Sequence, residues 1–320
     1  MAKESNKVKK RQSVSIIGAG KVGQALAHAL QPIGYPIVAL VFRNQEKVQN
    51  FSEQRRRLFP KTALLAFEDL SKLPKSDLIF ITTPDDVIKE TVKKLAALNR
   101  PLVSFLKSAL SGPQGAILHT SGALSSEILS SLSGPRCHVG SIHPLVSVTS
   151  GDPDSHVFEG AYFCVEGQKA AVVYAQSIVQ ELGAKSVHIR TDHKALYHAA
   201  AVMASPHLVA LFEMALELMM LTGVDRMDRD EARKILLPLV ESTVRNLHAS
   251  DPSLALTGTF ARGDVGTVKS HLKALKGKPK PPLEALEIYK LLGLRSLELA
   301  RKRGLDPKKI SEITKLLKGQ

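Results

Sequence analysis

The chain has 320 residues, of which 44% are hydrophobic, with two cysteines and a formal net charge of +14 at pH 7. At about 150 residues per domain this length predicts two domains, and two cysteines exclude a disulfide framework or a zinc cluster and fit a reducing cytoplasm. The basic balance suits an anionic small molecule better than nucleic acid, because the clustered lysines and arginines lie outside any recognisable nucleic-acid-binding motif. We therefore expect a cytoplasmic protein that binds no nucleic acid.

We expect neither a signal peptide at the N-terminus nor a membrane span. The N-terminus, MAKESNKVKKRQ, is basic but lacks a cleavage-like site, so we expect a frayed tail rather than a signal peptide. We also expect no membrane span, because we count no apolar run that reaches the about 18 residues a span needs.

Short apolar runs alternate with amphipathic stretches over the first 190 residues. This alternation predicts a parallel, doubly wound α/β sheet with helices between the strands. The expected strands are 14–18, 37–42, 63–67, 78–82, 116–120, 137–142, 161–166 and 186–189, and the expected helices are 22–31, 45–58, 86–98, 102–110, 125–132 and 169–182.

Strand signals stop after Asp192. Residues 193–221 form one long apolar, helix-like run, which Pro206 should kink. We therefore expect an α/β domain over 1–190 and an all-α domain over 191–320. Its further helices are predicted near 228–249, 264–275, 282–303 and 307–318.

Three glycines in the segment GAGKVG stand between the first strand and the first helix. In this context G-x-G-x-x-G is a dinucleotide-binding fingerprint: Gly18 permits the tight turn, Gly20 lets the backbone approach a pyrophosphate, and Gly23 lets helix and strand pack closely. Backbone N–H groups at the start of the helix then face the phosphates. The expected cofactor contacts are Gly18, Ala19, Gly20, Lys21, Val22 and Gly23.

The residue expected to meet the cofactor ribose is basic. An acid about 20 residues beyond the fingerprint would bind the 2′-hydroxyl of NAD, but counting from Gly23 leads to Arg43, in VFRN. A guanidinium cannot accept that hydrogen bond, whereas it binds a 2′-phosphate bidentately, so we expect NADP(H). The alternative for Arg43 is a solvated charge at a strand end. Asn44 is expected to cap the next helix and could also touch the phosphate.

Two further loops follow predicted strands at the carboxyl edge of the sheet, where doubly wound folds bind ligands. Thr82, Thr83 and Pro84 form the first, and its alternative reading is a plain turn set by the proline. In the second, the hydroxyl of Ser121 and free N–H groups beside Gly122 would seat a substrate carboxylate. The alternative there is that Ser121 or Ser125 caps a helix.

Histidines and a lysine supply the candidate acid–base groups. His143 stands at the carboxyl end of a predicted strand and is either a substrate contact or a structural residue. Lys194 and His198 are four residues apart, so they project from one helix face, and Ser205 lies about three turns further along it.

Reduction of a carbonyl or imine needs a proton as well as a hydride. A lysine with a lowered pKa or a histidine can donate this proton. Either Lys194 or His198 could therefore be the acid and the other the orienting group. The alternative is an ordinary helix-start lysine beside an interfacial histidine. The eleven histidines show no metal-binding spacing, so no metal site is expected.

The segment ALTGTFARGD, residues 255–264, is predicted to be a loop that enters a helix capped by Asp264. Arg262 stands between small residues and can bind a carboxylate bidentately. An ion pair with Asp264 or a dimer contact is the alternative. The run from Val209 to Leu221 is apolar on more than one face, which predicts a homodimer.

The fingerprint, Arg43 and the segments TTPDD (82–86), HTSGALSSEIL (119–129), GSIHPL (140–145), KALYHAAAVMAS (194–205) and ALTGTFARGD (255–264) together resemble a known family. It is that of the bacterial Rossmann-like oxidoreductases with a C-terminal helical domain of unknown function, in the phosphogluconate dehydrogenase superfamily. Its relatives include ketopantoate reductase, pyrroline-carboxylate reductase and hydroxyisobutyrate dehydrogenase. The resemblance runs over about residues 12–290.

The resemblance implies an NADP(H)-dependent reductase or dehydrogenase that acts on a small carboxylate-bearing carbonyl, hydroxy or imine compound. It places loop 82–84 beside the nicotinamide ribose and Ser121 toward the substrate. A non-catalytic NADP(H)-binding sensor or scaffold is the alternative. Related enzymes carry Lys-x-x-x-Asn where this chain has Lys194 and His198, and often Asn where it has Pro206-His207.

Overall fold

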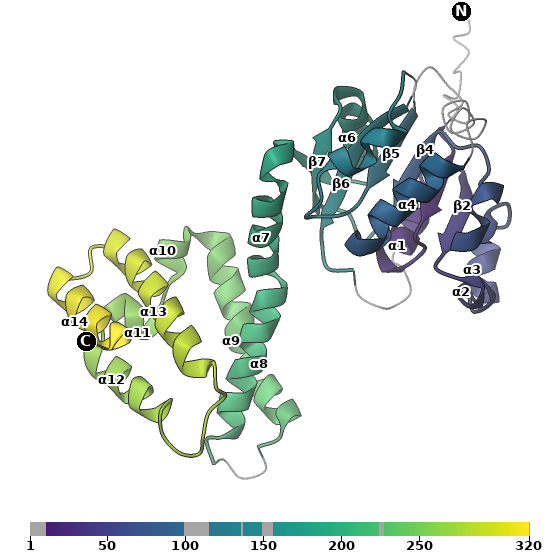
Figure 1. The fold of residues 1–320 in the computed structure, drawn as a ribbon. Coiled ribbons are helices and arrows are strands. Elements are labelled where there is room, and N and C mark those ends of the chain that lie inside the picture. The colour runs from purple at the N-terminus through teal and green to yellow at the C-terminus, as the bar shows by residue number, and fades with distance from the viewer. Residues whose placement is uncertain (1–10, 99–114, 136, 149–155, 224–226, 320) are drawn as a thin grey trace, which may run out of the picture. The chain divides into compact units, whose positions relative to one another are not determined.

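The computed structural model describes residues 11–98, 115–135, 137–148, 156–223 and 227–319 (Figure 1). The chain forms two compact units, which divide between Ala204 and Ser205, whereas the sequence predicted a boundary near residue 190. The expected helix 102–110 and most of the basic N-terminal tail lie outside the described residues.

One eight-stranded sheet forms the centre of the first unit, in the order β3-β2-β1-β4-β5-β6-β7-β8. Each expected strand is present. The strands are β1 (Val14–Ile17), β2 (Ile37–Phe42), β3 (Ala63–Ala66), β4 (Leu78–Ile81), β5 (Gly115–His119), β6 (Cys137–Leu145), β7 (Tyr162–Gly167) and β8 (Lys185–His188).

The expectation of a wholly parallel sheet is wrong at one place, because β6 and β7 are antiparallel. The end of β6 at Leu145 pairs with the start of β7 at Tyr162. Parallel neighbours need a crossover connection, usually a helix, and the described residues between these two strands contain none. The other neighbouring strands pair in parallel.

Helices cover both faces of this sheet (Figure 1). Alternate residues of the central strands face opposite cores: Ile16 and Phe80 belong to the cluster that includes α1 and α6, while Ile17 and Ile81 belong to the one that includes α4. Burial on both faces explains why the strands read as continuous apolar runs. The helices are α1 (Lys21–Leu30), α2 (Gln45–Gln49), α3 (Glu53–Leu58), α4 (Asp85–Ala97), α6 (Lys169–Glu181) and α7 (Lys194–Ala204), with 3-10 turns η1 (Phe67–Lys72), η2 (Ser126–Leu132) and η3 (Thr191–His193).

Two predicted helices of the first unit differ from the expectation. The stretch 45–58 is two helices, because Ser52 caps a new one by accepting a hydrogen bond from the N–H of Arg55. The stretch 125–132 is a 3-10 helix rather than an α-helix.

The second unit is helical among its described residues and has its own small core. Val268, Leu272, Leu297, Ile313 and Leu317 are buried together. The helices are α8 (Pro206–Met220), α9 (Arg229–Ala249), α10 (Pro252–Ala255), α11 (Gly258–Arg262), α12 (Val265–Ala274), α13 (Ala285–Lys302) and α14 (Pro307–Lys318).

The expected kink at Pro206 is a complete break. Helix α7 ends at Ala204, Ser205 is non-helical with φ −124° and ψ −81°, and Pro206 opens α8. The predicted loop 255–264 is instead largely helical, as α11. Its last residue, Asp264, does cap α12 by accepting a hydrogen bond from the N–H of Thr267 at 3.1 Å.

The segment Thr191–Met220 is long and apolar enough to cross a membrane by length and composition alone, with a mean hydropathy of 1.6. The expectation that no apolar run reaches this length is therefore wrong. Isolated His, Ser and Pro residues interrupt the apolar run, but they barely lower its mean hydropathy. Only 6% of the apolar window is buried.

Candidate functional site

The glycine-rich turn follows β1 and lies against the residues that follow β4. Gly18 adopts φ +108°, and a Cβ there would lie 2.6 Å from the N of Thr83 and 2.7 Å from the carbonyl carbon of Thr82. Both the backbone conformation and the close approach of the second loop thus require glycine. This is the point where the strand order reverses, with β2 on one side of β1 and β4 on the other, and it is the usual ligand-binding crevice of such sheets.

The other two glycines of the turn have opposite surroundings. A Cβ on Gly20 would meet no atom within 4 Å, so the space above it is open. A Cβ on Gly23 would overlap the carbonyl oxygen of Gly18 and lie 2.6 Å from Thr82 Oγ1. Gly23 therefore lets α1 pack against the turn, whereas Gly20 leaves room for a ligand.

The start of α1 is suited to an anion. Gly20 is its N-cap and offers no side-chain hydrogen bond, and the first turn contains no acidic residue. The N–H groups of Lys21, Val22 and Gly23 have no acceptor within the helix, and they carry the positive end of its dipole. The N–H of Ala19 is committed, because it donates to Val41 O at 2.8 Å. This geometry fits the pyrophosphate of a dinucleotide.

Cationic side chains lie at the end of β2 and beside the turn. Arg43 follows β2, is exposed and forms no ion pair with any described residue. Asn44 caps α2 by accepting a hydrogen bond from Lys47 N at 3.1 Å, which confirms its capping role. Its contact with a phosphate stays a prediction.

Sequence reasoning missed Arg55, which it grouped with the solvated charges. The guanidinium of Arg55 donates to Gln24 Oε1 at 3.0 Å, and Gln24 Nε2 donates to Ala19 O at 2.8 Å. Arg55 therefore reaches the glycine turn from α3. No local signal in the sequence links it to a residue 31 positions earlier.

The loop after β4 holds the glycine turn in place. Thr82 Oγ1 donates to Gly18 O at 2.6 Å. Thr83 Oγ1 is buried and has no hydrogen-bond partner among the described residues. An unpartnered buried hydroxyl costs free energy, which indicates a group that a ligand would satisfy. Pro84 is the N-cap of α4 and fits the plain-turn reading.

The loop after β5 corrects the predicted carboxylate seat. Ser121 N donates to His119 Nδ1 at 3.2 Å, and Ser121 Oγ accepts from Ala123 N at 3.2 Å and Leu124 N at 2.9 Å. The expected free N–H groups beside Gly122 are therefore wrong for these three residues, since the loop satisfies them internally. Ser121 caps its own turn, and its hydroxyl hydrogen is what remains to offer a ligand.

Two histidines converge on Gly122. A Cβ on this glycine would overlap His198 Nδ1 and lie 2.9 Å from His143 Nε2. The two imidazole rings are edge to face, with centroids 5.6 Å apart. Nδ1 of His198 is buried without a partner among the described residues. The structure thus brings together three of the residues predicted from sequence, and glycine is required at position 122 because the rings occupy that space.

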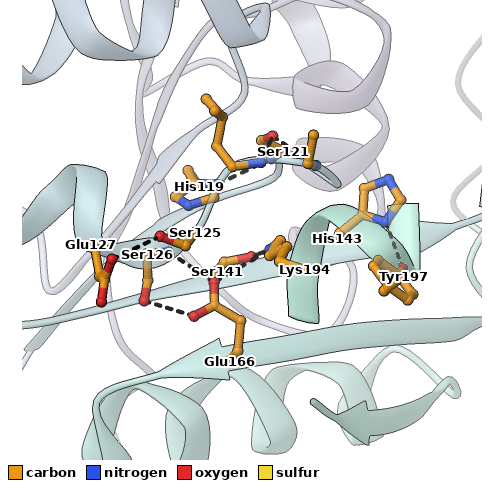
Figure 2. A network of polar contacts seen from close by, with 12 residues as sticks. His119, Ser121, Ser125, Ser126, Glu127, Ser141, His143, Glu166, Lys194 and Tyr197 are labelled. Carbon is orange, nitrogen blue, oxygen red and sulfur yellow. Dashed lines mark hydrogen bonds and ion pairs between the residues drawn. The ribbon is translucent and has the colours of Figure 1, made fainter. Parts of the chain in front are cut away.

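Tyr197 is the fourth member of this group and was not predicted. Its hydroxyl lies 2.7 Å from His143 Nδ1 (Figure 2). Burial, followed by the charge of Lys194, lowers the pKa of His143 to about 4. Burial likewise raises the pKa of Tyr197. Both side chains are therefore neutral at pH 7, with one hydrogen shared along the contact.

Lys194 is buried in a separate polar network (Figure 2). Its Nζ donates to Ser141 Oγ and lies 3.4 Å from Glu166 Oε1. The Glu166 carboxylate also accepts from the N–H of Ser126 at 2.9 Å and from its hydroxyl at 2.8 Å. Burial lowers the pKa of Lys194, and the charge of Glu166 opposes this shift.

Glu166 could have been noticed in the sequence, because it is a lone carboxylate in the otherwise apolar strand AYFCVE. A charge in a buried strand needs a partner. The identity of that partner, 28 residues later, is visible only in the fold.

The remaining predicted residues lie in the second unit. Ser205 is exposed at the break before α8. Arg262 is the exposed last residue of α11, and its backbone oxygen accepts from Lys309 Nζ at 3.4 Å. Their substrate roles stay predictions. Among the described residues, no group of three or more His, Cys, Asp or Glu side chains is placed to hold a metal ion.

Two family profiles match the sequence. Residues 1–144 match a Rossmann-like domain, and residues 161–296 match a domain of unknown function, DUF2520. No curated protein matches the chain.

Several solved structures share this fold. Protein TM1727 from Thermotoga maritima is 21% identical with a TM-score of 0.65, covering 91% of this chain and 99% of that one. BF3122 from Bacteroides fragilis, a candidate NADP oxidoreductase, is 22% identical with a TM-score of 0.66, covering 90% and 99%. Pyrroline carboxylate reductase from Plasmodium falciparum, solved with NADP bound, is 13% identical with a TM-score of 0.55, covering 95% and 98%.

The predicted fold class is thereby confirmed. An eight-stranded, mostly parallel sheet is followed by a helical region. In chain order, the match to a Rossmann-like domain precedes the match to DUF2520, in keeping with the resemblance described above.

Proposed function

We propose that the chain is an NADP(H)-dependent oxidoreductase that transfers a hydride to or from a small carboxylate-bearing carbonyl, hydroxy or imine compound. The observation that carries the proposal is that the three glycines have different surroundings. Gly18 makes the turn, Gly23 lets the helix pack against it, and Gly20 faces open space. A turn that bound nothing would not need glycine at the open position. Similarity to structures of NADP-linked oxidoreductases supports the proposal.

In this proposal the first turn of α1 holds the pyrophosphate, and Arg43 binds the 2′-phosphate. Arg55 adds a second positive charge beside the turn through its contact with Gln24. Thr83 Oγ1, which is buried without a described partner, contacts the nicotinamide end. The bound nicotinamide would supply or accept the hydride.

The chain's own residues must then supply the proton and hold the substrate. His143, His198 and Gly122 form one cluster in the first unit, and we assign the reacting group to its neighbourhood. Lys194 or His198 donates the proton and Ser121 offers its hydroxyl. Ser205 and Arg262 stay proposed substrate-binding residues. A neutral His143 suits a hydrogen-bonding role toward an uncharged carbonyl or imine.

Two measurements test the proposal on the unmodified protein. Isothermal titration calorimetry with NADPH and NADH should show binding of both, with NADPH the tighter. Absorbance loss of NADPH over a panel of 2-oxo acids and cyclic imines should then reveal turnover. Binding without turnover across the panel favours the sensor alternative, and no heat with either nucleotide removes the cofactor assignment altogether.

We further propose that the chain is a cytoplasmic homodimer. Exposed apolar side chains lie along α8 and α9, including Val209 at 69% and Leu239 at 64% exposure. The same two helices also carry ionic residues, such as Glu213 on α8 and Arg229 on α9, which pair with each other. An apolar face with charges interleaved fits a second protein surface better than lipid.

A further inference from the structure

A buried ion pair joins Lys194, one of the two candidate proton donors, to Glu166, which the chemistry proposed above does not use. Lys194 is 1% exposed and Glu166 is fully buried, and their charged atoms lie 3.4 Å apart. Taking two charges out of water is costly unless the geometry also satisfies their other hydrogen-bonding atoms. Such a pair therefore needs a reason.

Neighbouring groups provide a hydrogen bond to each carboxylate oxygen of Glu166. Both oxygens of Glu166 accept hydrogen bonds from Ser126, one from its N–H and one from its hydroxyl. Ser141, which faces Glu166 across the antiparallel β6–β7 pair, accepts from Lys194. Four chain segments, β6, β7, η2 and the start of α7, therefore meet at one buried charge pair.

The pair sits at the base of the helix that carries the candidate acid. Lys194 is the first residue of α7, and Tyr197 and His198 are three and four residues later, on the same face. Tyr197 reaches His143, and His198 reaches Gly122. One helical turn therefore contains both the anchor and the two side chains that enter the histidine cluster.

We propose that Glu166 and Lys194 are positioning residues whose ion pair fixes the first turn of α7 on the sheet, and that His198, rather than Lys194, donates the proton. The ammonium of Lys194 is buried and already donates to Ser141 and Glu166, so two of its three hydrogens are engaged within the protein. His198 instead has a buried Nδ1 without a partner among the described residues.

The assignment of His198 as the proton donor rests on the proposed function, whereas the positioning role of Glu166 and Lys194 does not. As the carbonyl or imine carbon accepts the hydride and is reduced, the electron pair of its double bond moves to oxygen or nitrogen. That atom takes a proton from the protonated form of the His198 ring, which becomes neutral, while the nicotinamide is oxidised. The His198 ring then recovers a proton from water.

Hydrogen exchange followed by mass spectrometry tests the positioning role on the full chain. Glu166→Gln and Lys194→Met each leave one buried charge unpaired, so amides of residues 194–204 should exchange at least about tenfold faster. The double variant Glu166→Gln/Lys194→Met has no unpaired charge and should return to the wild-type rate. Asp192→Asn breaks an exposed ion pair just before the same helix and is the matched control, with no change expected.

Histidine NMR provides a signature that general destabilisation does not share. The groups facing His143 are His119 from β5, Cys164 from β7, and Lys194, Tyr197 and His198 from α7. In the wild type its ring should stay neutral down to a pH of about 4. In Glu166→Gln the loosened α7 should let it titrate closer to about 6.5. The double variant should restore the burial of His143 but lacks the charge of Lys194, so its midpoint should lie between those of the wild type and Glu166→Gln.

Two outcomes overturn the positioning role: single variants with wild-type exchange and titration, or a double variant as impaired as the singles. If the single variants fail to fold, a folded double variant supports the role and an unfolded one overturns it. Kinetics test whether His198 is the proton donor. His198→Gln should lower kcat about a hundredfold or more on a substrate from the panel. The double variant Glu166→Gln/Lys194→Met should lower kcat less than about tenfold. The reverse ranking assigns the donor to Lys194. Calorimetry with NADPH tests the cofactor assignment separately from all of these results.

Discussion

Thr82 and Gly18 are joined by a hydrogen bond of 2.6 Å from the threonine hydroxyl to the glycine carbonyl. This contact fixes the turn after β1 to the loop after β4. Replacing Thr82 with Val removes a bond worth about 1 kcal/mol and should loosen the turn. We expect NADPH to bind several-fold more weakly by calorimetry. Thr83→Val should leave the turn intact, so any loss of affinity there reports a direct nucleotide contact. Equal NADPH affinity in Thr82→Val and wild type would show that this hydrogen bond is not needed to hold the turn for nucleotide binding.

The second prediction separates the two glycines that have normal backbone angles. Gly23→Ala places a methyl group against Gly18 and Thr82 and should lower the free energy of unfolding by about 1–3 kcal/mol, measured by urea denaturation. Gly20→Ala projects into open space, so the fold should keep most of its stability while nucleotide affinity falls. If Gly20→Ala binds NADPH as well as wild type does, the open space is not the pyrophosphate site.

The third prediction concerns cofactor choice. Arg43→Ala should weaken NADPH binding by about ten- to a hundredfold, the value of a charge-assisted hydrogen bond, while NADH binding changes little. Arg55→Ala should weaken both nucleotides, because its contact with Gln24 also supports the glycine turn. Arg57, exposed on the same helix, provides the matched control. Equal losses for both nucleotides in Arg43→Ala argue against a 2′-phosphate contact.

The fourth prediction follows from His119, which is fully buried on β5. Burial, followed by the charge of Lys194, lowers its pKa to about 4, below the about 6.5 of an unfolded histidine. Between these values the unfolded chain binds more protons, so stability falls as the pH drops from about 6.5 to 4, by on the order of 3 kcal/mol at most. Urea denaturation across this range should show the fall, and His119→Gln should make it shallower while leaving the contribution of His143, whose pKa is also lowered to about 4. An equally steep fall in His119→Gln assigns the proton uptake elsewhere.

The fifth prediction tests the dimer. Val209→Glu with Leu239→Glu places two charges on the exposed apolar face of α8 and α9 and should yield a monomer by analytical ultracentrifugation. Leu58, an exposed leucine on α3, serves as the control position for the same substitution. A monomeric wild-type protein at micromolar concentration removes the proposal.

Local patterns in the sequence predicted much of the fold. The eight strands, the glycine turn and the caps at Asn44 and Asp264 depend on periodicity and on neighbours within a few residues. The antiparallel β7 was missed because direction depends on the connection, and a short apolar strand has the same pattern in either direction.

The sequence identified some residues of the candidate site, but it missed Tyr197 and Glu166 and did not predict the arrangement. Lys194, His198, Gly122 and His143 were each identified from residue type and position. That Lys194 pairs with Glu166, while Gly122 makes room for two imidazole rings, depends on contacts between residues far apart in the chain. Burial decides these roles, and it is a property of the assembled sheet.

The break at Ser205 has a consequence for how such proteins diversify. The glycine turn, Arg43, the histidine cluster and the buried anchor of α7 are all encoded before it. Ser205 and Arg262, which are also proposed to bind the substrate, are encoded from that joint onward. Recombination between paralogous genes at this joint would therefore keep the residues proposed for cofactor binding and proton delivery together.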